Sequence, residues 1–262
     1  MSDRPLQLFD SHVHLDRLPA PQSLEEALHL ARKRGISGWL IPGVRAHDWG
    51  RLFALAEEND QVWAAPGLHP LAAEQWTPQA RRELKSLLGH DKALAIGEIG
   101  LDRLLDVPMA SQEKAFREQL AVAAEQQKPV LIHCRRAWAE VLTVLRREKW
   151  QTGGILHAFG GSLALARQGV DLGFAISFGG PLTYPNARRR IEVLQGLPAT
   201  AVVLETDAPD LPPHPHQRQV NRPEWLLLIA QRVAELRGWS LAETARITTE
   251  NARRVLGIEA RP

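Results

Sequence analysis

Seven side chains of the types that bind metal ions lie at or just beyond the ends of short apolar segments. In chain order they are His12, His14, Glu98, His133, His157, Glu205 and Asp207. The segments before them have the length and apolar content of strands buried on both faces. In a closed ring of parallel strands the carboxyl ends form one face, and active sites collect there. We therefore expect these side chains, although far apart in the sequence, to meet in the active site of an enzyme.

The first segment ends in two imidazoles, His12 and His14, which Asp10 and Asp16 flank. Residues i and i+2 of an extended chain point the same way. Both rings can therefore face the mouth of a barrel and bind one ion. This spacing is a weak signal by itself, and its position at the end of the first of eight strands strengthens it.

Glu98 lies between Gly97 and Gly100, directly after an apolar segment. The two glycines allow close approach of the backbone, and a carboxylate can bridge two cations. His133 and His157 end the fifth and sixth segments. A single buried histidine is usually hydrogen-bonded in a core, but two at equivalent ends of neighbouring strands favour ligation of a metal.

The last segment ends in two acids, Glu205 and Asp207. We expect Asp207 to reach a cation and to orient or deprotonate a water, which makes it a candidate catalytic residue beside Glu98. Glu205 could instead satisfy neighbouring groups deeper in the barrel. Four histidines and two carboxylates are too many ligands for one catalytic zinc, which typically keeps three protein ligands. They suit two divalent cations about 3.5–4 Å apart, with zinc or manganese favoured over magnesium.

The segments that carry these side chains alternate with helix-like stretches along the chain. We predict strands at 6–10, 38–42, 62–67, 93–97, 130–134, 154–157, 173–176 and 201–205. This alternation predicts an α/β fold, a TIM-type (β/α)8 barrel of the metal-dependent hydrolase type. Residues 1–262 would form a single domain. Ser111 and Ser162 can cap the helices after the fourth and sixth strands.

Composition excludes several classes of protein. With 44% hydrophobic and 24% charged residues the chain is typical of globular proteins, and no apolar stretch approaches the ~20 residues of a membrane span. A net charge of +2 is too small for a general polyanion-coating protein. The single cysteine, Cys134, excludes an internal disulfide, and strand alternation turns it away from the mouth. We expect a cytoplasmic monomer, and the sequence identifies no protein partner.

Several motifs resemble those of the TatD family of metal-dependent deoxyribonucleases, within the amidohydrolase-type barrels. They are Phe9–Asp16, Gly67–Pro70, Gly97–Asp102, Pro129–Ala137 and Leu204–Pro209. The resemblance implies that two metals share Glu98. The first would be held by His12, His14, Glu98 and Asp207, and the second by Glu98, His133 and His157. His69 and Arg135 would then face the phosphate of the substrate.

The chain departs from the family pattern at two places near the expected mouth. Arg103 and Leu104 follow Asp102, where family members commonly carry an aromatic pair, and the loop 210–216 has no counterpart in the pattern. These departures concern the substrate and leave the metal ligands unchanged. Arg103 is a further candidate for substrate binding, because a guanidinium fork suits phosphate.

Three functions fit these features. The first is a divalent-metal-dependent hydrolase that cleaves phosphodiester bonds in DNA through a water activated by two metal ions. The second is hydrolysis of a small amide, lactone or ester on the same barrel. Many such barrels bridge their metals with a carboxylated lysine where this chain has Glu98, which favours phosphoester chemistry. The third is a metal-dependent nucleic-acid-binding module without turnover. If the ligand is single-stranded DNA, Trp76 and Trp138 could stack bases.

Overall fold

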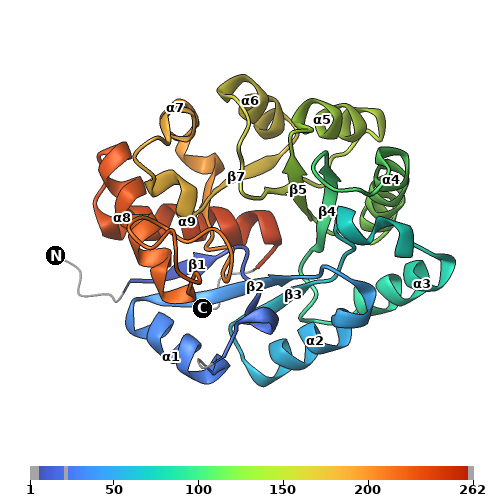
Figure 1. Ribbon diagram of the computed structural model, residues 1–262, viewed down its shortest axis with the longest axis horizontal. Helices are drawn as coiled ribbons and strands as arrows, with labels where there is room; N and C mark the ends of the chain where they lie inside the picture. The colour runs from blue at the N-terminus through green and yellow to red at the C-terminus, as the bar shows by residue number, and fades with distance from the viewer. Residues whose placement is uncertain (1–5, 21–22, 259–262) are drawn as a thin grey trace.

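Parallel strands form the centre of the molecule, and helices surround them (Figure 1). The computed structural model describes residues 6–20 and 23–258, so the two ends of the predicted 1–262 domain lie outside the described part. The strands are β1 (Leu8–Asp10), β2 (Ile36–Pro42), β3 (Val62–Ala65), β4 (Ile96–Asp102), β5 (Val130–Arg135), β6 (Gly154–Leu156), β7 (Phe174–Phe178) and β8 (Val202–Leu204). This arrangement confirms the predicted TIM-type barrel.

Backbone hydrogen bonds close the ring. The strands pair as β1 to β3 and as β4 to β8, in sequence order within each group. At the seam between β3 and β4, the amide of Leu94 donates to the carbonyl of Ala64 at 3.0 Å. At the seam between β8 and β1, the amide of Ser11 donates to the carbonyl of Leu204 at 3.0 Å. All eight carboxyl ends therefore face one mouth.

The fourth strand differs most from its prediction. We predicted residues 93–97, but β4 begins at Ile96 and continues to Asp102, preceded by an isolated bridge between Ala93 and Ala64. All of β4 is buried, and its second half pairs with β5. Gly100 and Asp102 in that half carry no strand signal, so pairing with β5 decides where this strand ends.

The helices that cover the barrel begin and end close to their sequence signals. They are α1 (Leu24–Lys33), α2 (Trp49–Glu58), α3 (Pro78–Leu87), α4 (Met109–Glu125), α5 (Trp138–Arg147), α6 (Leu163–Asp171), α7 (Arg188–Gly196), α8 (Leu226–Arg237) and α9 (Leu241–Leu256). Ser162 caps α6 as predicted, because its hydroxyl accepts from the amide of Leu165. The prediction for Ser111 is wrong: α4 begins after Pro108, so Ser111 lies inside the helix. Within the described ranges, the helices lack the combination of length and apolar character that crossing a bilayer requires.

Apolar side chains fill the barrel interior. One layer consists of Phe9, Leu40, Ala65, Ala95, Leu131, Ile155, Ala175 and Val203, all buried. Ala252 and Leu256 of α9 belong to the same cluster and extend it to the C-terminal helix. A larger cluster joins other strand residues to the surrounding helices. Because the strands pack against the barrel interior on one face and the helices on the other, the side chains at their carboxyl ends are held in fixed positions.

Candidate metal centre

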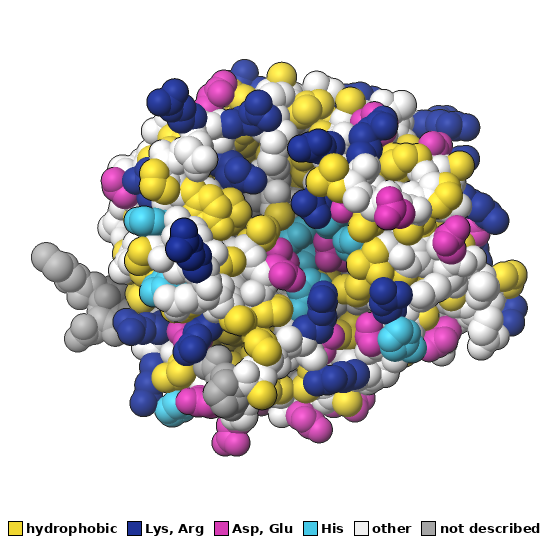
Figure 2. All heavy atoms as spheres, in the orientation of Figure 1, with side chains coloured by type: hydrophobic (Ala, Val, Ile, Leu, Met, Phe, Trp, Pro, Cys, Tyr) yellow, Lys and Arg dark blue, Asp and Glu magenta, His cyan; other side chains and the backbone are white. Residues whose placement is uncertain are grey.

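A cleft of about 1050 Å³ opens at the carboxyl ends of the strands. Figure 2 shows a hollow near the centre of one face, with histidine and acidic side chains in its floor and basic side chains around it. The predicted ligands that line the cleft are His14, Glu98, His133, His157 and Asp207. His12 is fully buried beside them. The structure thus brings all six predicted ligands together.

A bulge in β4 aims Glu98 into the cleft. Ile96 pairs with Val130 and Ile99 with Ile132, so β4 has one more residue than β5 between these two pairs. Bulges of this kind re-aim side chains beside active sites. Close packing accompanies the bulge, because a Cβ atom on Gly97 would lie only 2.5 Å from Cβ of Leu131. The close backbone approach expected of this glycine is confirmed.

One oxygen of Glu98 faces the two histidines that follow β1. Glu98 Oε2 lies 3.3 Å from His12 Nε2 and 3.8 Å from His14 Nε2. Asp207 Oδ1 lies 3.5 Å from His12 Nε2 and 3.7 Å from His14 Nε2. Two imidazole nitrogens and two carboxylate oxygens therefore surround one small volume, and they are donors that a divalent transition metal accepts.

The other oxygen of Glu98 faces a different set of nitrogens. Glu98 Oε1 lies 2.6 Å from His133 Nδ1, 3.6 Å from His157 Nε2 and 3.8 Å from His69 Nε2. The two oxygens of a single carboxylate thus divide the surrounding imidazoles into two groups. A carboxylate in this position can contact two cations at once.

Buried acids orient two of these imidazoles. His157 Nδ1 lies 3.0 Å from Glu205 Oε2, and the other oxygen of Glu205 accepts from the amide of Ala158 at 2.8 Å. His133 Nε2 lies 3.1 Å from Asp102 Oδ2. Burial lowers the pKa of His157, but Glu205, Asp207 and Glu98 outweigh this and raise it to about 10 in the metal-free protein. A cation would displace the second ring proton, and the N–H that remains on the carboxylate would fix the tautomer. Sequence reasoning missed this role of Asp102, although Asp102 is in the motif that contains Glu98.

Three ring nitrogens of His12 and His14 make no hydrogen bond within the described part of the chain, although His12 Nε2 lies close to two carboxylates. They are His12 Nε2 and Nδ1 and His14 Nδ1, and all three are buried. Burial lowers the pKa of both imidazoles, so they are neutral and keep a lone pair. Burial also raises the pKa of Asp207 well above its usual range, and Glu98 and Glu205 nearby add to this effect. A divalent cation would use the free lone pairs and favour the ionised carboxylate, so this donor set fits such ions.

His69 is buried beside the cluster but is oriented differently from the other histidines. Its Nδ1 accepts a hydrogen bond from the amide of Leu71 at 3.0 Å. Burial lowers the pKa of His69 to about 3, so the ring is neutral and its hydrogen is on Nε2. The nitrogen that faces Glu98 is therefore a donor. This geometry favours a hydrogen bond to a substrate oxygen over ligation of a metal.

Three arginines near the mouth of the barrel, Arg103, Arg135 and Arg136, lie in different surroundings. Arg135 lines the cleft, and its side chain is 58% exposed with Nη1 3.9 Å from Asp102 Oδ2. Arg136 also lines the cleft. Arg103 does not, and its guanidinium forms an ion pair with Glu140 of α5. Substrate binding by Arg103 would require release from this partner.

Trp76 and Trp138, the candidates for base stacking, contact other side chains of the protein. Trp138 lines the cleft but is only 7% exposed, and its ring lies 4.5 Å from that of Phe159. Trp76 donates from Nε1 to Glu118 at 2.7 Å. Cys134 lines the cleft, so the expectation that alternation turns it away from the mouth is wrong, but the residue is buried. Burial raises the pKa of its thiol to about 12. The loop expected at the mouth contributes Asp210 and Leu211 to the cleft wall.

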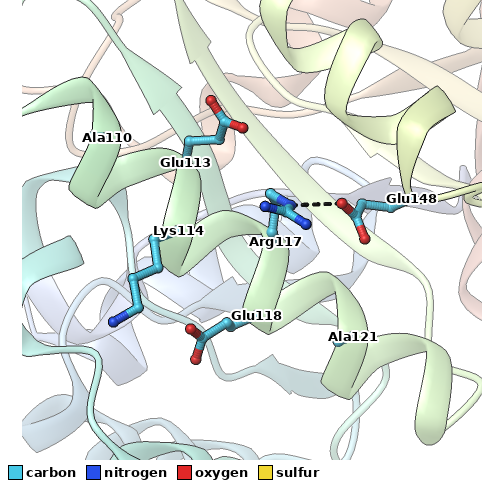
Figure 3. Close-up of a pocket in the computed structure, with 7 residues that line it drawn as sticks. All are labelled: Ala110, Glu113, Lys114, Arg117, Glu118, Ala121 and Glu148. Atoms are coloured by element: carbon cyan, nitrogen blue, oxygen red, sulfur yellow. Dashed lines mark hydrogen bonds and ion pairs between the residues drawn. The ribbon is translucent and has the colours of Figure 1, made fainter.

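A second, shallower depression of about 470 Å³ lies on the outer face of α4 (Figure 3). Its lining includes the ion pair between Arg117 and Glu148, with Nε and Oε1 2.6 Å apart. Alanine side chains and three further charged residues complete it. Its lining has three acids, two bases and no histidine, so it does not resemble the metal centre.

Comparisons with known proteins place the chain in a family. Residues 9–257 match the family model described as TatD related DNase. The chain is 38% identical over 253 residues to the uncharacterized metal-dependent hydrolase YabD of Bacillus subtilis, covering 96% of this chain and 99% of that protein. It is 34% identical over 268 residues to a protein of Cronobacter sakazakii named 3'-5' ssDNA/RNA exonuclease TatD, covering 97% and 100%. The crystal structure of the TatD homologue YjjV from Escherichia coli K12 matches with a TM-score of 0.89 and 34% identity, covering 96% and 98%. The chain therefore belongs to the TatD family of metal-dependent hydrolases, as its motifs predicted.

Proposed function

We propose that this hydrolase cleaves phosphodiester bonds in single-stranded nucleic acid, DNA above all, with two divalent cations at Glu98. The observation that carries the proposal is the division of the imidazole nitrogens between the two oxygens of Glu98. One ion would be held at Oε2 by His12, His14 and Asp207, and the other at Oε1 by His133 and His157. The nitrogen and oxygen donors favour zinc or manganese.

Residues among and around the predicted ligands would accept a proton and bind the phosphate. Bound divalent cations offset negative charge on phosphate and lower the pKa of water. Asp207, which lies among the predicted ligands, would accept the proton of an attacking water once a bound cation favours its ionised form. His69 would donate its Nε2–H to a phosphate oxygen. The exposed fork of Arg135 at the rim would hold the same phosphate.

The charge of the cleft supports a phosphodiester over a neutral ester. Five arginines line it: Arg17, Arg135, Arg136, Arg189 and Arg190. Outside the ligand cluster its acids are Glu140, which pairs with Arg103, and Asp210. A positive cleft attracts a polyanion and gives no such advantage to a lactone or amide. The relatives named as ssDNA/RNA exonucleases support the same substrate class.

The test measures metal content and substrate range in the wild type and in a variant that lacks the Glu98 carboxylate. Wild type and Glu98→Ala are stripped with a chelator and reloaded with zinc, manganese or magnesium. Each is assayed on a single-stranded oligonucleotide, bis(p-nitrophenyl) phosphate, p-nitrophenyl acetate and a lactone. We expect two ions per chain in the wild type and oligonucleotide cleavage that falls by at least about 10²-fold in the variant, because even outer ligand partners cost 10–100-fold.

The alternatives give different results in the same experiment. Faster turnover of the ester and lactone than of both phosphodiesters would favour the acyl hydrolase. Tight binding of the oligonucleotide without turnover under all three metals would favour a binding module. One ion per chain in an active enzyme would contradict the bridging role of Glu98.

A further inference from the structure

Arginines are concentrated on one wall of the cleft. Four of them, Arg135, Arg136, Arg189 and Arg190, form what we term the arginine wall. The first two lie at the end of β5 and just beyond it, and the last two lie in the first turn of α7. Between these pairs the loop that follows β6 lines the cleft with Gly160 and Gly161. The wall is therefore cationic at both ends and has no side chains at these two central positions.

Arg190 of this wall has no acidic partner. It is half-buried, yet among the residues that the structure describes no carboxylate lies within ion-pair distance of its guanidinium. The same is true of Arg189. Burial lowers the pKa of Arg190, and the positive charge of Arg189 adds to the effect. A partly desolvated cation beside a second one is stabilised by an anion, and this pair is therefore suited to bind one.

Burial without an acidic partner distinguishes Arg190 from many other arginines of this protein, some of which are paired with acids. Arginines in ion pairs elsewhere on the surface include Arg81, Arg103, Arg117, Arg147, Arg232 and Arg246. These side chains lie outside the lining of the cleft. Within the described ranges, other arginines without an acidic partner also occur outside the cleft, such as Arg34, Arg51 and Arg188, but these side chains are exposed. Arg190 differs from them because it is half-buried and lines the cleft beside a second cation.

The position of Arg190 relates it to the metal centre. A Cβ atom on Gly160 would lie 3.6 Å from Arg190 Nη2. Gly160 follows the predicted ligand His157 by three residues, which span at most about 11 Å. The guanidinium is therefore close enough to serve the same substrate, but it belongs to α7, which carries none of the predicted ligands.

We infer that Arg189 and Arg190 bind a phosphate next to the one that is cleaved, so that the enzyme selects oligonucleotides over substrates with a single phosphodiester. The inference rests on the proposed phosphodiesterase function. A guanidinium fork binds two phosphate oxygens at once. Each phosphate contact on a single strand also contributes about 0.7 to the slope of log affinity against log salt.

The test uses the holoenzyme of a double variant, Arg189→Gln with Arg190→Gln. Its control is Arg188→Gln, because Arg188 is exposed in the same turn but does not line the cleft. For each protein, kcat/KM is measured on a single-stranded oligonucleotide and on bis(p-nitrophenyl) phosphate, over a range of salt concentrations. We expect the ratio of the two values to fall about tenfold in the double variant, as for loss of charged hydrogen bonds. The salt slope for the oligonucleotide should become shallower by about 0.7, as for loss of one phosphate contact, and the control should keep the wild-type ratio.

Each other outcome has a defined meaning. An unchanged ratio in the double variant, or equal losses on both substrates, overturns the inference and leaves the phosphodiesterase proposal standing. Failure of the fully loaded wild type to hydrolyse either substrate overturns the proposed function and the inference with it. Metal content measured in the double variant separates loss of a phosphate contact from damage to the metal centre.

Discussion

Asp10, at the end of the first strand, accepts two hydrogen bonds from Thr206, which follows the last strand. The amide of Thr206 lies 2.9 Å from Oδ1 of Asp10, and its hydroxyl lies 2.6 Å from Oδ2. Oδ1 also accepts from the amide of His12 at 3.3 Å. Burial raises the pKa of Asp10 to about 7, and the hydrogen bonds of Thr206 oppose that rise. One buried side chain thus joins the backbone beside His12 to the backbone beside Asp207.

Removal of the Thr206 hydroxyl tests this connection. Thr206→Val keeps the shape but leaves Asp10 Oδ2 without its donor and the amide of Ala208 without its acceptor. We expect the free energy of unfolding in urea to fall by about 1–3 kcal/mol, the cost of leaving buried polar groups unpaired. Thr206→Ser retains the hydroxyl and should remain closer to wild type. Equal stability of the two variants would contradict the role of the hydrogen bond.

The contact between Glu205 and His157 gives a second prediction. Glu205→Gln can offer an amide N–H to His157 Nδ1 and no longer fixes the tautomer that leaves Nε2 free. We expect metal affinity to fall about 10–100-fold, the usual effect of removing an outer partner of a ligand. Competition with a chromophoric chelator measures it. Glu192→Gln, on the exposed face of α7, should bind metal like wild type. Unchanged affinity in Glu205→Gln would mean that Glu205 does not orient His157 for a metal and only satisfies neighbouring groups deeper in the barrel.

Substitution of Asp207 separates chemistry from folding. Asp207→Asn is nearly isosteric and cannot accept a proton as the carboxylate can. Because burial already favours the neutral acid in the metal-free protein, the amide should cost little stability. We expect phosphodiester hydrolysis to be abolished while the circular dichroism spectrum and the urea midpoint stay near wild type. Retained turnover, with chelated controls inactive, would remove Asp207 from the reaction.

The thiol of Cys134 should be unreactive in the folded protein. Only the thiolate reacts with iodoacetamide, and burial raises the pKa of this group to about 12. At pH 8 a group with that pKa is ionised in about one molecule in 10⁴. Alkylation should therefore be slow at pH 8, become faster as the pH rises, and be rapid after unfolding. Mass spectrometry checks the modification, and rapid labelling of the native enzyme at pH 8 would contradict the burial of the thiol.

Much of this protein follows from local sequence. Buried parallel strands need continuous apolar segments, so eight such runs alternating with capped helices predicted the barrel. The same rule placed His12, His14, His133 and Asp207 at one mouth, because they follow strands whose carboxyl ends must converge. The boundary of β4 did not follow, since its buried second half contains Gly100 and Asp102 and is held by pairing with β5.

Tertiary structure decided how these side chains act together. A sequence gives the spacing of residues along one strand, but distances between side chains of different strands depend on register and on the bulge that turns Glu98. That geometry divides the imidazoles between Oε1 and Oε2, and it places Asp102 and Glu205 behind two of the rings. It also separates Arg103, neutralised by Glu140, from the unpaired Arg190 at the cleft. Residue type therefore determined which chemistry was available, and packing between distant segments determined which groups can take part in it.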